Sequence, residues 1–198
     1  MVPKEDSFEK VLSAARNGEE WAISVLWRTF QPPLLRYLRG VCGASAEDAA
    51  SETWLSVGDS LPRFRGDESG FRAWLFTLGR RRAIDHNRRT ARDPIPVDRI
   101  PEELSQDVVH EELVRREALA LAMRYLDDLP LEQREVVLLR TVGGFDVDQV
   151  ASIMDKRSGT VRVIHHRALK HLAQALKANP VTHEGGDSIS DDEDVFAA

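Results

Sequence analysis

The chain has 198 residues, 42% of them hydrophobic, which is enough for one large or two small domains with apolar cores. Its single cysteine, Cys42, excludes an internal disulfide and a zinc site built from several cysteines, as suits a reducing cytoplasm. No apolar run reaches membrane-spanning length and the first residues, MVPKEDSFEK, lack a signal-peptide pattern, so we expect a cytoplasmic protein that is not inserted in a membrane.

The formal net charge of −6 conceals blocks of opposite sign. Residues 64–92 carry eight arginines against three acids, and residues 93–112 carry seven acids and one arginine. Residues 156–177 have six basic side chains and no acid, whereas residues 178–198 have six acids and no lysine or arginine. Such segregation predicts separate surfaces for separate partners, and nucleic acid is the expected partner of the basic blocks.

Helical periodicity dominates the chain and no stretch alternates between apolar and polar residues, so the predicted fold class is all-α. Asp6 and Glu9 have the spacing of a capping box for a first short helix, which Gly18 can close. A longer helix follows. It is expected to break at Pro32-Pro33, because proline lacks an amide donor and its ring clashes with the preceding turn.

A further helix is predicted from Ser45 to Leu61, ended by Pro62. The helix after it completes an N-terminal domain of residues 1–92. Four apolar residues at i, i+3, i+4 and i+7 spacing form a core stripe on this helix, namely Phe71, Trp74, Leu75 and Leu78. Phe64 and the loop of residues 65–70 lie outside the stripe and are therefore candidates for function.

Aromatic rings interleaved with arginines in residues 64–92 favour nucleic-acid binding. Guanidinium groups neutralise phosphates, and flat rings give unpaired bases a surface for stacking. The alternative is an ordinary amphipathic helix whose rings are core and whose arginines face solvent. We expect some residues of this stretch to bind nucleic acid and others to be ordinary core or solvent-facing residues of an amphipathic helix. His86 is expected to face DNA or solvent rather than to act in catalysis.

Residues 93–112 contain three prolines, no sustained apolar period and many acids, which predict a flexible, extended linker. A plain solvated spacer and a segment with a specific role both remain open for it. A second helical domain is predicted over residues 113–177. In it, Asp146 and Gln149 form a capping box for one helix, a turn of residues 155–159 follows, and a last helix begins at Thr160. This order is the helix-turn-helix pattern.

The last helix has two faces when it is projected at about 100° per residue. Its core face carries Val161, Ile164, Ala168, Leu172 and Ala175. The opposite face has what a recognition helix needs, which is basic groups for phosphates and guanines and small or apolar groups for thymine methyls. A solvated amphipathic helix is the alternative, but Val163 in the middle of the polar face has no packing reason to be there.

Taken with their spacing, the two basic helices resemble the bacterial extracytoplasmic-function (ECF) sigma factors, initiation subunits of RNA polymerase. The N-terminal resemblance covers Leu34 to Arg89, through LLRYLRG, AEDAASETWLSV, RFRG and FRAWLFTLGRRRAIDHNRR. The C-terminal resemblance covers Leu129 to Leu176, through LPLEQREVVLLRTVGG, DQVASIM and GTVRVIHHRAL. It implies two small helical domains, similar to sigma regions two and four and joined by the acidic linker, and a protein that is not an enzyme.

The resemblance also implies roles for individual residues. Contacts to the melted non-template strand of the minus-ten element correspond to Phe64, Arg65, Arg72, Trp74, Arg80, Arg81 and Arg88. Contacts to the minus-thirty-five duplex correspond to Thr160, Arg162, Val163, His166, Arg167 and Lys170. Docking on the β′ clamp of the polymerase corresponds to Asp48, Ser51 and Glu52, with Ser51 in place of the glutamine usual in the family.

The implied partners are core RNA polymerase, through its β′ clamp and β flap, promoter DNA and an anti-sigma factor. No cofactor or metal is expected, because the six histidines are scattered and no cysteine or carboxylate cluster has ligand spacing. A free-standing helix-turn-helix regulator is the alternative function, but it gives Phe64 and the linker no task. The tail, residues 178–198, is expected to be disordered. It is open whether the tail solubilises the protein, folds back on a basic DNA-binding face or signals degradation.

Overall fold

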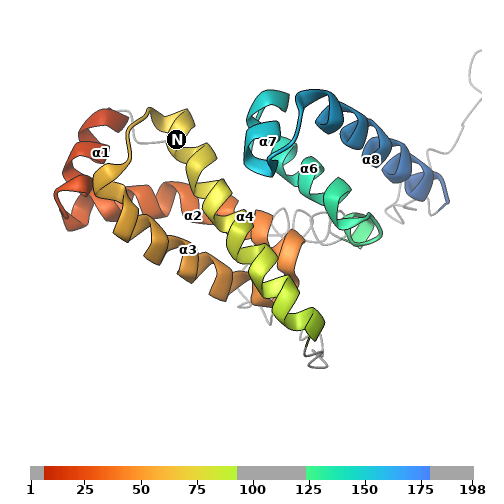
Figure 1. Cartoon of the computed structure of the whole chain (residues 1–198), viewed down its shortest axis with the longest axis horizontal. Coiled ribbons are helices and arrows are strands. Elements are labelled where there is room, and N and C mark those ends of the chain that lie inside the picture. The colour runs from red at the N-terminus through yellow and green to blue at the C-terminus, as the bar shows by residue number, and fades with distance from the viewer. Residues whose placement is uncertain (1–6, 93–123, 179–198) are drawn as a thin grey trace, which may run out of the picture.

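The computed structural model describes residues 7–92 and 124–178, and within them every regular element is a helix (Figure 1), which confirms the all-α prediction. The N-terminal domain consists of α1 (Phe8–Arg16), α2 (Glu20–Cys42), α3 (Ala46–Ser60) and α4 (Glu68–Arg92), with 3-10 turns at Gly43–Ser45 and Leu61–Arg63. The C-terminal domain consists of α6 (Leu131–Thr141), α7 (Val147–Met154) and α8 (Ser158–Ala178), preceded by helical residues 124–127. The predicted linker and, apart from Ala178, the predicted tail lie outside the described residues.

Helix α2 continues through Pro32 and Pro33, so the predicted break is wrong. Neither proline has an amide hydrogen, and two carbonyls of the preceding turn lose their usual partners. Packing outweighs this loss because the buried stripe of the helix runs across the prolines, from Phe30 to Leu34 and on to Leu38. One helix of 23 residues therefore serves as the base on which α1, α3 and α4 pack.

Phe71 of α4 lies at the centre of the N-terminal core. It is fully buried, and its ring centroid lies 5.1 Å from that of Phe30 on α2 and 5.8 Å from that of Phe8 on α1. In the predicted core stripe of α4, Phe71 and Leu75 are buried, whereas Trp74 and Leu78 are half-buried. Because three helices pack around this one ring, the first turns of α4 are held in place, and the candidate DNA-binding loop lies directly before them.

Local hydrogen bonds set the helix starts. Ser7 caps α1, with its Oγ accepting from the Lys10 amide at 3.4 Å, and Asp6, the expected cap, lies outside the described residues. The predicted capping box of α7 is confirmed. Asp146 Oδ1 accepts from the Gln149 amide at 2.8 Å, and Gln149 Oε1 accepts from the Asp146 amide at 3.0 Å.

The turn between α7 and α8 is shorter than predicted. Helix α8 begins at Ser158, so Gly159, which was expected in the turn, lies in the first turn of the helix. The chain reverses at Asp155, which has a φ of +54°, and aspartate tolerates this left-handed conformation because its short side chain can bond locally. Ser158 Oγ donates to Asp148 Oδ1 at 2.5 Å and ties the start of α8 to α7. The helix-turn-helix itself is confirmed.

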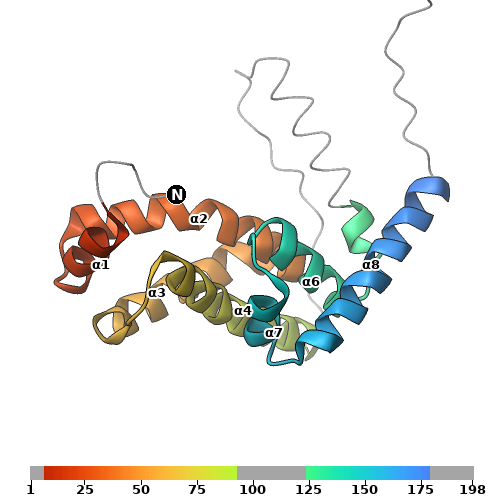
Figure 2. The ribbon, with the colours of Figure 1, turned by 90° about the horizontal axis from the view of Figure 1, so that it is seen from above.

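The two domains touch where α2 meets α6 and where α4 meets α7 (Figures 1 and 2). Phe76, which lies outside the predicted stripe of α4, is fully buried at this contact. Its ring centroid lies 5.0 Å from that of Phe145, just before α7, and 5.4 Å from that of Tyr37 on α2. The apolar core is therefore continuous between the domains.

Cys42 is expected to react slowly with thiol reagents. Its Sγ donates to the Leu38 carbonyl oxygen at 3.2 Å, and burial raises its pKa to about 11. At about pH 8 the reactive thiolate is therefore scarce in the folded protein, whereas an unfolded cysteine has a pKa of about 8.5. We expect iodoacetamide to modify the folded chain roughly 100-fold more slowly than the urea-unfolded chain. Equal rates in the two states would contradict this description of the thiol.

Candidate nucleic-acid interface

Phe64 and Trp74 form the aromatic part of the candidate surface. Their rings are stacked, with centroids 4.8 Å apart and planes inclined by 25°, and Phe64 also meets Phe71 edge-on at 5.6 Å. Both Phe64 and Trp74 are half-buried, so part of each ring remains exposed. A hollow of about 250 Å³ lies beside them and is lined by Ser60, Arg63, Phe64 and Trp74.

The loop before α4 is fixed by hydrogen bonds to its backbone. Arg16 Nη2 donates to the Phe64 carbonyl oxygen at 2.5 Å, and Arg65 Nη1 donates to the same oxygen at 2.8 Å. Asp67 Oδ1 accepts from the Gly70 amide at 2.7 Å and caps the first turn of α4. The ring of Phe64 is therefore presented by a loop whose geometry is set before any ligand binds.

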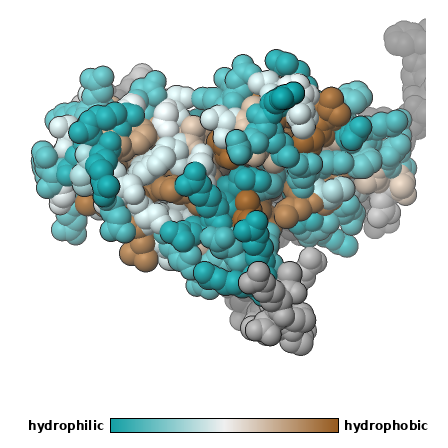
Figure 3. Space-filling model, in the orientation of Figure 1, coloured by the Kyte–Doolittle hydropathy of each residue, from teal (hydrophilic) through white to brown (hydrophobic). Residues whose placement is uncertain are grey.

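The predicted arginines of α4 fall into two groups. Arg81 and Arg88 are exposed on the C-terminal half of the helix, over which Figure 3 shows a hydrophilic surface. Arg72, in the N-terminal half, and Arg80, at the middle of the helix, are half-buried; Arg72 lies 3.6 Å from Glu68 of its own helix, and Arg80 pairs with Glu135 of α6. Of these four arginines, the structure thus leaves the first two open to phosphate groups.

The three predicted docking residues lie on α3, where a fourth side chain, Leu55, is exposed beside them. Asp48 and Ser51 are exposed and Glu52 is half-buried. Leu55 is 71% exposed and lies one helical turn beyond Ser51 and Glu52. These four residues have i, i+3, i+4 and i+7 spacing, the sequence signal by which Leu55 could have been assigned to the docking face.

The Glu52 carboxylate is engaged within the N-terminal domain. It lies 3.8 Å from nitrogens of Arg82 and Arg89 and 3.2 Å from His86 Nε2, all three on α4. The side chain of His86 is 13% exposed, so the expectation that it faces DNA or solvent is wrong. The sequence placed these residues on two predicted helices but could not show that the helices pack with these faces together. The cluster ties α3 to the basic part of α4.

The predicted recognition face of α8 is exposed throughout. Its members are Thr160, Arg162, Val163, His166, Arg167 and Lys170. On the other side of the helix, Val161 and Ala168 are fully buried and Ile164 is nearly so, in the contacts of α8 with α6 and α7. Val163 is 49% exposed, an apolar side chain on an otherwise polar face. The helix therefore presents a basic surface with one apolar contact to whatever binds there.

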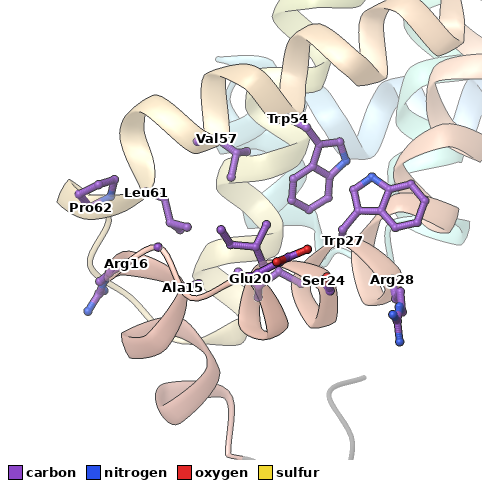
Figure 4. A pocket seen from close by; sticks show the side chains of 14 residues that line it. Ala15, Arg16, Glu20, Ser24, Trp27, Arg28, Trp54, Val57, Leu61 and Pro62 are labelled. Carbon is purple, nitrogen blue, oxygen red and sulfur yellow. The ribbon is translucent and has the colours of Figure 1, made fainter.

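An apolar groove of about 780 Å³ lies between α2, the end of α1 and α3 (Figure 4). The rings of Trp27 and Trp54 lie close together on its wall, with Val57 and Leu61 farther along α3 and the turn after it. Trp27 is 49% exposed. Exposed apolar grooves of this kind commonly accept a helix of another protein.

Among residues 7–92 and 124–178, no group of three or more His, Cys, Asp or Glu side chains could hold a metal ion. None of the helices in that part of the chain combines the length and the apolar character needed to cross a membrane.

Family models match both domains. The model described as Sigma-70 region 2 matches residues 26–93, and the model described as Sigma-70, region 4 matches residues 119–172. The ECF RNA polymerase sigma factor SigD of Mycobacterium tuberculosis (strain ATCC 25618 / H37Rv) is 30% identical over 186 residues, which cover 90% of this chain and 88% of SigD. This chain belongs to the ECF RNA polymerase sigma factors. The resemblance inferred from the two basic helices is confirmed.

A second relative has the same family name, and two solved structures share the fold. ShbA of Streptomyces griseus subsp. griseus is 31% identical over 171 residues, 80% of this sigma factor and 89% of ShbA. The fold is shared by CnrH, solved in complex with the cytosolic domain of CnrY, with a TM-score of 0.64 and 21% identity over 88% of this chain and 99% of that one. It is also shared by the sigma factor RpoE, solved with the anti-sigma factor NepR from Bartonella quintana, with a TM-score of 0.59 and 21% identity over 77% and 95%. Sigma factors direct transcription initiation and are not enzymes.

Proposed function

We propose that this sigma factor binds core RNA polymerase and recognises the minus-thirty-five element as duplex and the minus-ten element as a melted single strand. The exposed face of α8 carries the proposal, because it follows a capped helix and a tight turn in the helix-turn-helix arrangement. Arg162 and Arg167 have the chemistry to contact guanine edges or phosphates, and Val163 to contact a thymine methyl. Lys170 adds a phosphate contact one turn further along.

For the minus-ten element the support comes from Phe64 and Trp74. Unpaired bases stack on such rings, and each stacked base contributes about 1–3 kcal/mol. The hollow beside the rings offers a place for a base that has left the duplex. Arg81 and Arg88, exposed on the same helix, are available for the phosphates of the displaced strand.

Gly66→Ala is expected to weaken binding of the minus-ten single strand. A Cβ at this position would lie 2.9 Å from Cζ of Phe64, and the φ of +156° is one that alanine rarely adopts. The ring must therefore move, and the loss of one stacked base corresponds to about 1–3 kcal/mol of binding free energy, measurable by fluorescence anisotropy with a labelled oligonucleotide. Gly58→Ala is the control, because its Cβ would meet nothing within 4 Å. Unchanged affinity for Gly66→Ala would remove Phe64 from the binding surface.

Polymerase docking is assigned to the α3 face of Asp48, Ser51 and Leu55. Glu52 is expected to act there by positioning, since its carboxylate is already paired with α4. By family likeness the C-terminal domain contacts the β flap, and the acidic residues 93–112 follow the polymerase channel between the two sites. These contacts would place the domains of the sigma factor over the two promoter elements at once.

We also propose that an anti-sigma factor controls this protein. RpoE was solved in complex with the anti-sigma factor NepR, and CnrH in complex with the cytosolic domain of CnrY. The groove of Trp27 and Trp54 supports such a partner here, because it leaves apolar surface exposed on the free N-terminal domain. A helix of the partner with apolar side chains at i, i+3 and i+7 would cover it.

Run-off transcription from a genomic promoter library, with bacterial core polymerase and with or without this protein, tests the proposal. We expect transcripts that appear only with the protein and whose promoters share two motifs a fixed distance apart. A free-standing helix-turn-helix regulator would instead shift duplexes without polymerase and add no transcripts. That outcome would overturn the proposed function.

A further inference from the structure

Helix α8 has a positive surface that the folded domains do not neutralise. The helix contains no Asp or Glu, and Arg162, Arg167 and Lys170 are exposed on its recognition face. Among residues 7–92 and 124–178, none of these three cations forms an ion pair. Arg167 and Lys170 are one helical turn apart, and like charges at this spacing repel each other. An acidic partner would therefore stabilise the face.

Acids on the neighbouring helices are engaged elsewhere. Glu132 of α6 pairs with Lys156, with 2.5 Å between Oε1 and Nζ, and Asp148 of α7 accepts from the hydroxyl of Ser158. The basic part of α4 differs in this respect, because the Glu52 carboxylate lies within 3.8 Å of two of its arginines. The recognition face of α8 is thus left without a counter-charge among the residues that the structure describes.

The sequence directly after α8 supplies such an acidic partner. Residues 179–198, which lie outside the described part of the chain, contain six acids and no lysine or arginine. Four of these acids are consecutive, at positions 191–194. An extended chain rises about 3.3 Å per residue, and a DNA strand carries one charge per about 3.4 Å, so the two have similar charge densities. The other acidic segment, residues 93–112, is joined directly to α4 instead.

The connection between these acids and α8 has a suitable length. At about 1.5 Å per residue, Lys170 lies about 12 Å and Arg162 about 24 Å back along the helix from Ala178. A flexible chain of n residues has a root-mean-square end-to-end distance of about 5–6 Å × √n, which places residues 191–194 about 18–24 Å from Ala178. The four consecutive acids can therefore reach the recognition face at the average extension of such a chain.

We propose that the acidic residues 184–194 occupy the recognition face of α8 in the free sigma factor and compete there with the minus-thirty-five duplex. The inference rests on the proposed duplex role of α8. Weak binding of a polyanion to a basic face has a Kd of about 10⁻⁴ M, and a short flexible connection gives an effective concentration of about 1 mM. About nine molecules in ten are then occupied, so the duplex must displace the acids before it binds. In the holoenzyme, the minus-ten contacts hold the duplex at a high local concentration and favour this displacement.

The contact is measured first, by NMR without DNA. A spin label on Ser190→Cys, in a Cys42→Ser background of the full chain, broadens the amide signals of residues that it approaches. We expect broadening at residues 160–170 in low salt and its loss at about 1 M salt, where the Debye length falls to about 3 Å. The tail variant carries the neutral substitutions Asp191→Asn, Asp192→Asn, Glu193→Gln and Asp194→Asn.

The tail variant should lose the broadening at residues 160–170 and keep it beside Ala178, because the connection to α8 is unchanged. Broadening that persists at residues 160–170 in this variant would show proximity without charge pairing and would overturn the proposal. Broadening at Arg81 and Arg88 of α4 in place of α8 would equally contradict it.

Duplex binding is measured next, by anisotropy with a labelled minus-thirty-five duplex from a promoter found by run-off transcription. The matched control, the surface variant, removes four negative charges from exposed side chains of both domains through Glu9→Gln, Glu20→Gln, Asp59→Asn and Asp128→Asn. We expect the tail variant to bind about 10-fold more tightly than the surface variant, as follows if nine molecules in ten are occupied. Its affinity should also fall more steeply with salt, since an intact tail takes up cations again when DNA displaces it.

The two variants have the same net charge, so equal affinities and equal salt dependence would reduce the tail to its contribution to net charge and refute the competition. A different result separates this inference from the proposed function. If the broadening responds as expected but no variant binds the duplex, the minus-thirty-five role of α8 is wrong, and the competition fails with it while the contact stands.

Discussion

Phe71→Ala is expected to lower the free energy of unfolding of the N-terminal domain by about 3–5 kcal/mol, the range for a large side chain removed from a closed core. Phe71 is fully buried and its ring contacts those of Phe8, Phe30, Phe64 and Trp74. The cavity cannot collapse easily, because α1, α2 and α4 all meet at this ring. Loss of the ring also removes the support behind Phe64, so binding of single-stranded DNA should weaken even under conditions where the domain remains folded.

Tryptophan fluorescence in a urea titration isolates this effect. The four tryptophans of the chain all lie in the N-terminal domain, at positions 21, 27, 54 and 74, so their signal follows that domain alone. Ile23→Ala serves as the control, because Ile23 is 43% exposed on α2 and its truncation should cost well under half as much. A loss below about 1 kcal/mol for Phe71→Ala would place the ring at a site that repacks freely.

Local patterns in the sequence predicted most of the fold because the N-terminal and C-terminal domains are built from amphipathic helices. The capping box of Asp146 and the buried face of α8 follow from spacing alone. The prediction of a helix break at Pro32-Pro33 failed because it used a local rule alone. Apolar packing on both sides of the prolines outweighs the loss of their backbone hydrogen bonds. Phe76 was not predicted to be a core residue, because the ring that it packs against, Phe145, is far away in the sequence.

The same distinction applies to the candidate site. The exposed face of α8 was predictable in full, because one helix determines it. The engagement of Arg80 and Glu52 was not predictable, since each pairs with residues of another helix and no local period encodes such a pairing. The sequence gives no reason to distinguish Arg80 from Arg81. In the structure Arg80 is half-buried and pairs with Glu135, whereas Arg81 is exposed. Charge along the chain predicts which segments bind nucleic acid, and tertiary contacts decide which side chains are free to do so.

Arg162→Ala and Arg167→Ala are each expected to weaken promoter binding by the polymerase holoenzyme by about 1–3 kcal/mol if the contact is to a base edge. Both side chains are exposed on the face opposite Val161 and Ala168, so their removal leaves the core of the helix-turn-helix intact. The effect should be confined to promoters that carry the preferred base at the contacted position. A contact to phosphate would instead weaken binding to all sequences and reduce the dependence of affinity on salt.

Lys177→Ala is the matched control, because it removes one positive charge from the same helix about 15 Å beyond Arg167, at the usual rise per residue. Equilibrium binding over a salt series, with promoters altered at single positions of the minus-thirty-five element, separates the three cases. Equal losses of affinity for all three variants on every promoter would show that this face of α8 contributes only a general electrostatic attraction for DNA. Unchanged affinity for both arginine variants would remove α8 as the recognition helix. A loss confined to Arg162 and Arg167 and to particular bases would establish direct readout, since only contacts at base edges distinguish one promoter from another.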